Sequence, residues 1–236
     1  MKVNALRTLG PVRAAALVGV VLAGGEGRRM GPGVPKPLRR LAGKPMVAHV
    51  VARLLPQVLD VVVVANEPPA ALGFLGVPVV PDLPEVQRAA SKEGRRLGPL
   101  AGILAGMEWS LKHHPEAGWI VTAPADVPLL PLDLTVRLCG HMHVPEPDVL
   151  MVRHGQRREH TVGVWSVTLV RDLRRAVLEE GVRRVEEFAQ RYRFEELAWP
   201  GAGECFLNVN TPEQLKLAEE HLARHRPAPV RRRFRR

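Results

Sequence analysis

The sequence has few cysteines and few aromatic residues, and each shortage excludes a class of protein. Among 236 residues only Cys139 and Cys205 are cysteines, and neither belongs to a CxxC pair or a His/Cys cluster. Two such thiols cannot form a disulfide framework or a typical zinc site, so we expect buried thiols in a cytoplasmic protein. Aromatic residues make up 4% of the chain, with one tyrosine. Single-stranded nucleic acids are usually bound by aromatic stacking between basic residues, so nucleic-acid binding is disfavoured.

Long apolar runs are also missing. No stretch of the sequence approaches the roughly 20 apolar residues that span a bilayer, so we expect no membrane association. Lys2, Arg7 and Arg13 precede the first apolar run, as in a secretory signal. Cleavage after Ala23 would, however, cut through the loop described below and destroy it, so we expect a cytoplasmic location. Hydrophobic residues still make up 46%, enough for one sizeable α/β domain.

Acidic residues are absent from the C-terminal segment. Residues 224–236 hold seven arginines and no acid, and without them the net charge of +10 falls to about +3 (10 minus 7). We expect this arginine-rich tail to be disordered, residues 1–14 to form a loose extension, and residues 15–223 to form a single domain. The tail could contact RNA, an acidic partner or a membrane surface, or have no specific partner.

A glycine-rich loop follows the first apolar run. Ala16–Ala23 is typical of a buried strand, and it continues into LAGGEGRRMG at positions 22–31. Without a Cβ, glycine lets backbone N–H groups approach a phosphate closely. Fixed positive charge comes from Arg28, Arg29 and Lys36. The P-loop pattern and the dinucleotide fingerprint both fail, because no Gly-Lys-Ser/Thr occurs and Met30 takes the third glycine position. The sequence therefore predicts a triphosphate-binding loop.

Strands and helices alternate along the first half of the chain. The patterns predict helices that begin at Pro45 and Pro99, and buried strands at residues 16–23, 58–65, 77–80 and 118–123. The second half is less regular. It predicts strands at 149–152, 162–167 and 206–209, two helical stretches between 169 and 191 that break at Gly181, and a final helix after a capping box from Thr211 to Gln214. We expect an α/β fold with a mainly parallel central sheet.

Polar residues follow several of the predicted strands. Ligands of an open parallel sheet bind beyond the carboxyl ends of its strands, where Asn66, Asp82 and Asp126 stand. Asp126 is the best ligand for Mg²⁺, although a helix N-cap is the alternative. Lys36 stands between two prolines and could neutralise charge on an α-phosphate and a departing pyrophosphate. An ordinary surface lysine is the alternative.

Four motifs together resemble one known family. They are the loop at 22–31 with Lys36-Pro37-Leu38, Gly98–Gly102, Pro124–Pro128 and Asn208–Pro212. Over roughly residues 17–222 their order and spacing resemble the MobA-like nucleotidyltransferases, the family of the molybdenum cofactor guanylyltransferases. The resemblance implies a three-layer, Rossmann-like nucleotidyltransferase fold. It also implies a Mg²⁺-dependent enzyme that transfers GMP from GTP to the terminal phosphate of molybdopterin and releases pyrophosphate. Transient contacts with other molybdenum cofactor proteins would follow.

The resemblance also assigns residues to roles. It implies that Lys36, Arg29 and Asp126 are catalytic, with Arg29 on the β- and γ-phosphates and Asp126 on the metal. It places Asn208 and Asn210 near the metal and the acceptor, whereas a structural turn is their alternative. The implied nucleotide-binding residues are Leu22, Ala23, Gly24, Gly25, Lys36, Asn66, Asp82, Gly98, Pro99, Leu100 and Asp126.

Several positions distinguish this chain from the family pattern or leave alternatives open. Gly24-Gly25 resembles the guanylyl branch, because related cytidylyltransferases usually carry Ala-Ala-Gly there. Pro35 replaces a common aspartate, and residues 84–97 predict a longer basic loop that could fold over the nucleotide. Basic residues that could bind the pterin phosphate, or be solvated, are Arg153, Arg157, Arg158, Arg183 and Arg184. The alternative functions are a transferase that uses CTP or a sugar-phosphate acceptor, and a non-catalytic polyanion- or RNA-binding protein.

Overall fold

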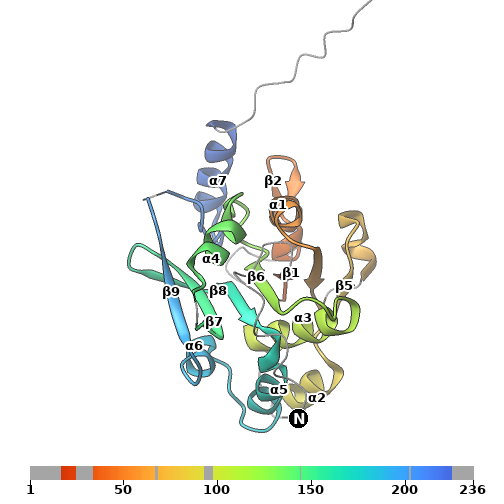
Figure 1. The fold of residues 1–236 in the computed structure, drawn as a ribbon. Helices are drawn as coiled ribbons and strands as arrows, with labels where there is room; N and C mark the ends of the chain where they lie inside the picture. The colour runs from red at the N-terminus through yellow and green to blue at the C-terminus, as the bar shows by residue number, and fades with distance from the viewer. Residues whose placement is uncertain are drawn as a thin grey trace, which may run out of the picture.

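The computed structural model describes residues 17–24, 34–66, 69–92, 98–143, 145–201 and 203–224. Its centre is a seven-stranded sheet in the order β5-β4-β1-β6-β8-β7-β9 (Figure 1). Only β8 runs antiparallel to its neighbours, so the predicted α/β fold with a mainly parallel sheet is confirmed. The strands are β1 (Leu17–Leu22), β4 (Asp60–Val64), β5 (Val79–Val80), β6 (Trp119–Pro124), β7 (Val149–His154), β8 (Arg157–Ser166) and β9 (Phe194–Trp199), with a separate hairpin of β2 (Arg40–Leu41) and β3 (Lys44–Pro45).

Helices cover both faces of the sheet. One apolar cluster joins the sheet to α1 and α4, and a second joins its other face to α2, α3, α5 and α6. The helices are α1 (Met46–Leu54), α2 (Pro84–Lys92), α3 (Pro99–His113), α4 (Leu134–His141), α5 (Val170–Leu178), α6 (Val185–Ala189) and α7 (Pro212–Arg224). Short 3-10 turns are η3 (Lys36–Leu38), η4 (Leu55–Gln57), η5 (Pro69–Ala71), η6 (Gly73–Leu75) and η7 (Val167–Leu169). The result is three layers.

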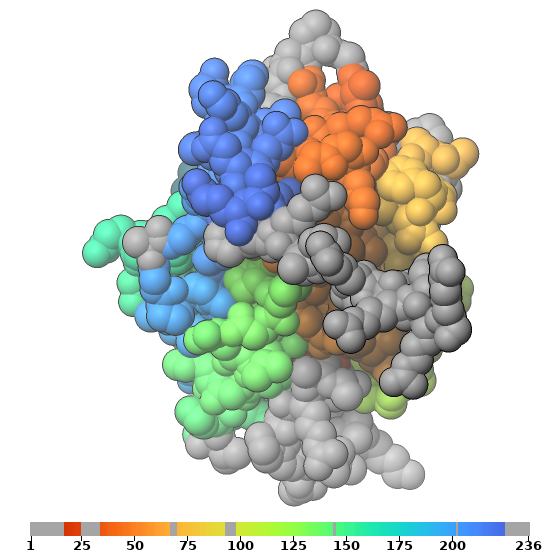
Figure 2. Space-filling model, turned by 90° about the horizontal axis from the view of Figure 1, so that it is seen from above, coloured from red at the N-terminus to blue at the C-terminus, as the bar shows by residue number. Residues whose placement is uncertain are grey.

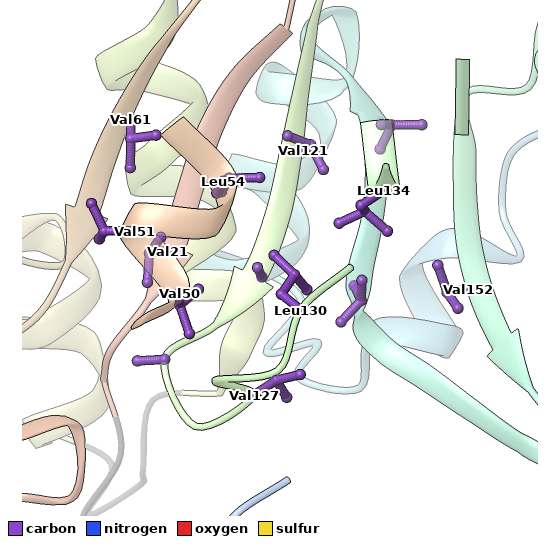
Figure 3. Packing of buried hydrophobic residues seen from close by; sticks show 14 of the residues in the cluster. Val21, Val50, Val51, Leu54, Val61, Val121, Val127, Leu130, Leu134 and Val152 are labelled. Carbon is purple, nitrogen blue, oxygen red and sulfur yellow. The ribbon is translucent and has the colours of Figure 1, made fainter. Parts of the chain in front are cut away.

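The central strand β1 is apolar on both faces because it is covered on both. Leu17 and Val21 point into the α1 layer, whereas Val18 and Val20 point into the α3 layer. Figure 3 shows Val21 beside the α1 residues of the first cluster. Gly106 lets α3 pack closely on β1, since a Cβ there would lie 2.4 Å from Val20 Cγ1. This packing fixes the sheet edge at which the candidate site lies.

The capping box predicted for the last helix is confirmed. The Gln214 backbone N–H donates to Thr211 Oγ1 at 3.3 Å, and the Thr211 N–H donates back to Gln214 Oε1 at 3.1 Å. The first-half strands and the two helices separated at Gly181 are confirmed as well. The final helix is anchored beside the β2–β3 hairpin, and Figure 2 shows it in blue next to the orange segment.

The structure corrects the prediction in the second half. Residues 206–209 form no strand, because Phe206 packs against Trp199 and the Val209 N–H donates to the Asp126 carbonyl rather than to a ladder. The last strand is β9, at the edge of the sheet, and its acidic and half-buried residues give no apolar alternation. β8 extends to Arg157, five residues before the predicted start, because it forms a long antiparallel pair with β7.

The predicted loop at 84–97 is also wrong over its first part. Residues 84–92 form α2, a helix that begins at a proline and buries Val86, while Ala89 and Ala90 line a cavity and most of its other residues are polar. Residues 93–97 lie outside the described residues, as do the predicted extension at 1–14 and residues 225–236 of the tail. Across the described part of the chain, every helix is too short or too polar to cross a bilayer.

Candidate active site

The candidate site centres on the ammonium group of Lys36. The side chain donates to the Asp126 carboxylate, to Asn210 Oδ1 and, at 3.3 Å, to Asn208 Oδ1. Only 11% of the Lys36 side chain is exposed, so the alternative of an ordinary surface lysine is wrong. Pro35 stands at the N-cap of η3 and Pro37 lies inside it, which restricts the backbone around the lysine. Three oxygen-bearing side chains therefore converge on one positive charge.

Separate parts of the fold bring these groups together. Asp126 follows β6 at its carboxyl end, and its carbonyl accepts from the Val209 N–H at 2.8 Å. That bond brings the segment that carries Asn208 and Asn210 next to Asp126. The Asn210 amide donates to Asn208 Oδ1 at 2.8 Å, and its backbone N–H donates to Gln214 Oε1 at 2.7 Å. The two asparagines thus serve both interpretations, since they form a structural turn and also contact Lys36.

One oxygen of the Asp126 carboxylate can still accept a hydrogen bond or bind a cation. This oxygen, Oδ1, is buried and has no hydrogen-bond partner among the described residues. A buried anionic oxygen without a donor is costly, so it marks a place for a cation or a donor from a ligand. The alternative of a helix N-cap is wrong, because the next helix begins at Leu134 with Asp133 at its N-cap.

A second polar group lies at the ends of β4 and β5. Asn66 Nδ2 donates to Asp82 Oδ2 at 2.7 Å, and Asn66 Oδ1 accepts from the Asp82 backbone N–H at 3.1 Å. The pair adjoins the glycine loop, because a Cβ built on Gly24 would lie 3.8 Å from Asn66 Nδ2. Burial raises the pKa of Asp82, and the hydrogen bond from Asn66 partly opposes that shift. Leu22 ends β1, and Ala23 follows it directly before Gly24.

The amino terminus of α3 borders the site from another side. Gly98 is the N-cap and Pro99 takes the first turn, whereas the Leu100 side chain is 1% exposed in the core. Gly98 lies against the Arg183 carbonyl, which a Cβ would approach to 3.1 Å. A cavity of about 140 Å³ opens between α2, α3 and α5 next to these residues.

Two predicted phosphate-binding residues cannot be placed. Gly25 and Arg29, with Arg28 and Met30 between or beside them, lie outside the described residues. The described segments on either side of the gap end at Gly24 and resume at Val34, two residues before Lys36. The roles of Gly25 and Arg29 stay predictions.

Three of the second-half arginines are paired with nearby carboxylates of β8, β9 and α6. Arg157 pairs with Glu159 at 3.2 Å, Arg153 with Glu196 at 3.6 Å, and Arg158 with Glu186 at 3.0 Å. These pairs leave less positive charge for an acceptor phosphate than the sequence predicted. Arg183 contributes its backbone carbonyl beside Gly98 and lines the cavity, so it adjoins a candidate nucleotide-binding residue.

The sequence did not reveal two polar residues that bear on the site. Gln87 of α2 donates to Asn66 Oδ1 at 3.2 Å, which a segment predicted as loop could not indicate. Glu159 of β8 is only 5% exposed, and burial raises its pKa, with the negative charge of Asp126 adding to the shift and Arg157 opposing it. No periodic signal marked either residue. Within the described ranges, no group of three or more His, Cys, Asp and Glu side chains could hold a metal by itself.

Comparison with known proteins identifies the family. The MobA-like NTP transferase domain matches residues 19–194. A molybdenum cofactor guanylyltransferase of Bradyrhizobium sp. (strain ORS 278) is 40% identical over 205 residues, covering 86% of this chain and 92% of that relative. The crystal structure of molybdopterin-guanine dinucleotide biosynthesis protein A from Archaeoglobus fulgidus has a TM-score of 0.67 at 25% identity, and covers 88% of this chain and 100% of that one.

A third likeness shows the fold alone. Rv0371C of Mycobacterium tuberculosis H37Rv, solved in complex with manganese, has a TM-score of 0.60 at 20% identity and covers 86% of this chain and 98% of that one. The residues that match the family include the glycine loop, η3, Asp126 and most of the central sheet. From the family match and the 40% identity, the chain belongs to the MobA-like NTP transferases.

Proposed function

We propose that this protein transfers GMP from GTP to the terminal phosphate of molybdopterin in the cytoplasm, where GTP is supplied. The products would be molybdopterin guanine dinucleotide and pyrophosphate. The observation that carries the proposal is the convergence of Lys36, Asp126, Asn208 and Asn210 at the carboxyl edge of the sheet. The guanylyltransferase name of the 40% identical relative supports the choice of substrates.

The chemistry needs charge and positioning more than a side-chain nucleophile. An oxygen of the molybdopterin phosphate is already anionic and forms the new bond to the α-phosphorus of GTP. The bond from that phosphorus to the bridging oxygen breaks, and pyrophosphate leaves with the electron pair. Lys36 would stabilise the charge that builds on the α-phosphoryl oxygens and the leaving group. Preorganised charge of this kind is usually the largest catalytic contribution.

The oxygens around Lys36 suit Mg²⁺. Asp126 offers a carboxylate whose Oδ1 lacks a partner among the described residues, and Asn208 and Asn210 offer amide oxygens. Hard divalent cations prefer such oxygens together with phosphate and water. Asp126 would hold the ion, with the asparagines beside it and the acceptor. When bound, Mg²⁺ would supply further neutralisation of the triphosphate charge.

Nucleotide recognition would fall to the second polar group and the glycine loop. Backbone groups of Leu22, Ala23, Gly24 and Gly25 would approach the nucleotide, and Arg29 would bind the β- and γ-phosphates. Guanine donates from N1 and N2, so the Asp82 carboxylate, held by Asn66, is a suitable acceptor for the base or the ribose. Gly98, Pro99 and Leu100 would contribute backbone groups on the other side.

Thermal unfolding with GTP, CTP, ATP and UTP, each with and without Mg²⁺, tests the nucleotide. Ligand at about a hundred times its dissociation constant adds roughly 2.7 kcal/mol to the unfolding free energy. For a chain of this size that raises Tm by about 5 to 11 °C, at about 2 to 4 °C per kcal/mol. We expect GTP to raise Tm in the presence of Mg²⁺, and we expect no such rise with CTP, ATP or UTP. A shift with CTP instead would contradict guanylyl transfer and leave a different nucleotidyltransferase.

Turnover tests the acceptor. Molybdopterin, GTP labelled at the α-phosphate and Mg²⁺ should yield labelled dinucleotide and one pyrophosphate per transfer. A sugar phosphate in place of molybdopterin serves as the control and should give no labelled product. Transfer to the sugar phosphate but not to molybdopterin would overturn the proposed acceptor.

A further inference from the structure

Helix α2 places one amide side chain on the Asn66–Asp82 pair. Gln87 Nε2 donates to Asn66 Oδ1 at 3.2 Å and to the Asp82 carbonyl at 2.9 Å. Asn66 Oδ1 also accepts from the Asp82 backbone N–H. An amide oxygen has two lone pairs, and these two donors use both. The orientation of the Asn66 amide is therefore fixed, and its Nδ2 must face Asp82 Oδ2.

The fixed amide leaves one carboxylate oxygen with spare accepting capacity. Among the described residues no donor reaches Asp82 Oδ1, although the whole residue is only 5% exposed. This oxygen lies beside α3, since a Cβ on Gly102 would be 3.8 Å from it. The opposite end of the pair adjoins Gly24 at the start of the glycine loop. The pair, with its free acceptor, thus lies between Gly24 and α3.

Helix α2 is itself held against the body of the protein. Val86, next to Gln87, is 2% exposed and packs in the same apolar cluster as Leu100. Arg174 of α5 donates to Glu85 of α2 at 2.6 Å and to Glu108 of α3 at 2.9 Å. Apolar packing and this bridge together keep Gln87 within reach of Asn66.

On the basis of the function proposed above, we propose that Gln87 is a positioning residue for nucleoside selection. It locks Asn66, and through Asn66 it aims the Asp82 carboxylate at two adjacent donors of the nucleoside. Guanine N1–H and N2–H offer such a pair, and so do the two ribose hydroxyls. Adenine and cytosine present a ring-nitrogen acceptor where guanine presents N1–H, so a carboxylate reading the base repels them.

Loss of the Gln87 amide would loosen this arrangement. Asn66 Oδ1 would keep the Asp82 backbone N–H as its one donor among the described residues, so the Asn66 amide and the Asp82 carboxylate that it contacts would be held less firmly. The carboxylate would lose its fixed direction without any change at Lys36 or Asp126, neither of which contacts α2. The expected consequence is weaker and less selective nucleotide binding with little effect on the chemical step.

Steady-state kinetics with GTP, ITP and 2′-deoxy-GTP test the proposal in the wild type, Gln87→Met and Gln87→Glu. ITP lacks the N2 amine, and 2′-deoxy-GTP lacks one ribose hydroxyl, so the two analogues separate base from ribose contacts. We expect KM for GTP to rise about 3- to 10-fold in both variants, the effect of one hydrogen bond, with kcat within twofold. The preference for GTP over one of the two analogues should fall by the same factor.

A second glutamine supplies the control for a purely structural loss. Gln57 donates to the Arg53 and Pro131 carbonyls and accepts from the Thr135 N–H, but it precedes β4 and lies toward the amino end of that strand. Gln57→Met should lower Tm and leave both nucleotide preferences unchanged. Unchanged preferences in the Gln87 variants, or a fall in kcat alone, would overturn the proposal. If the wild type binds GTP but transfers nothing to molybdopterin, the proposed reaction fails, and dissociation constants for the same three nucleotides then test Gln87.

Discussion

Replacement of Lys36 by methionine should separate catalysis from folding at this site. The substitution keeps most of the side-chain volume and removes the charge that contacts Asp126, Asn208 and Asn210. Loss of one preorganised charged donor typically lowers kcat by about 10²- to 10³-fold, or roughly 2.7 to 4 kcal/mol of transition-state stabilisation. We expect a loss of at least this size in GMP transfer, with a smaller effect on GTP binding.

The same variant should also be less stable. The Lys36 and Asp126 side chains are 11% and 20% exposed, so the ion pair is largely shielded from water. Hydrogen bonds to charged groups contribute about 1.5 to 3 kcal/mol, and we expect the variant to lose about 2 kcal/mol of unfolding free energy. For a chain of this size that lowers Tm by about 4 to 8 °C, which leaves a folded protein for the kinetic assay.

Lys44 offers a matched control. It is an exposed lysine of β3, eight positions along the chain, and Lys44→Met should change neither kcat nor Tm appreciably. Product formation is measured by single turnover with enzyme in excess, so that slow product release does not mask the chemical step. A Lys36→Met variant that stays within threefold of wild-type kcat would refute the assigned role of Lys36.

Three further outcomes follow from the geometry. Asp126→Asn removes the charge beside the unpartnered Oδ1, so the Mg²⁺-dependent part of the GTP-induced Tm shift should disappear in thermal unfolding, and a retained shift would contradict the metal role. Gly106→Ala places a Cβ 2.4 Å from a methyl of Val20 and should cost about 1 to 3 kcal/mol in urea unfolding, whereas Gly140→Ala, with open space around it, should cost nothing measurable. Asp82 has a raised pKa in the folded state, so the folded protein binds more protons than the unfolded chain and this residue's contribution to stability falls as pH rises from about 4 through the raised pKa. The wild-type unfolding free energy minus that of Asp82→Asn should therefore decrease across that window, and a difference that increases would show the opposite shift.

The sequence predicted the parallel half of the fold well because burial on both faces leaves a simple pattern. β1 and β4 are nearly continuous apolar runs, and α1, α2 and α3 each begin at or directly after a proline. β9 gave no such pattern, because an edge strand with half-buried acidic residues can pair through its backbone alone. The apolar residues around Phe206 led to the opposite error. They predicted a strand at 206–209, whereas they pack as an irregular segment.

The candidate site shows the same limit at the level of single residues. The position of Asp126 after a buried strand could be predicted, since carboxyl ends of parallel strands share one edge. Its partners could not be predicted from spacing, because Lys36 and Asn210 are 174 positions apart and meet through the Val209 bond to the Asp126 carbonyl. That backbone bond belongs to neither a strand nor a helix, so no periodicity reports it. The resemblance of the motifs identified Lys36 and Asn210 as candidate site residues. The fold supplies the physical reason that they share one site, because the backbone bond from Val209 to Asp126 brings the Asn210 segment to the aspartate that Lys36 contacts.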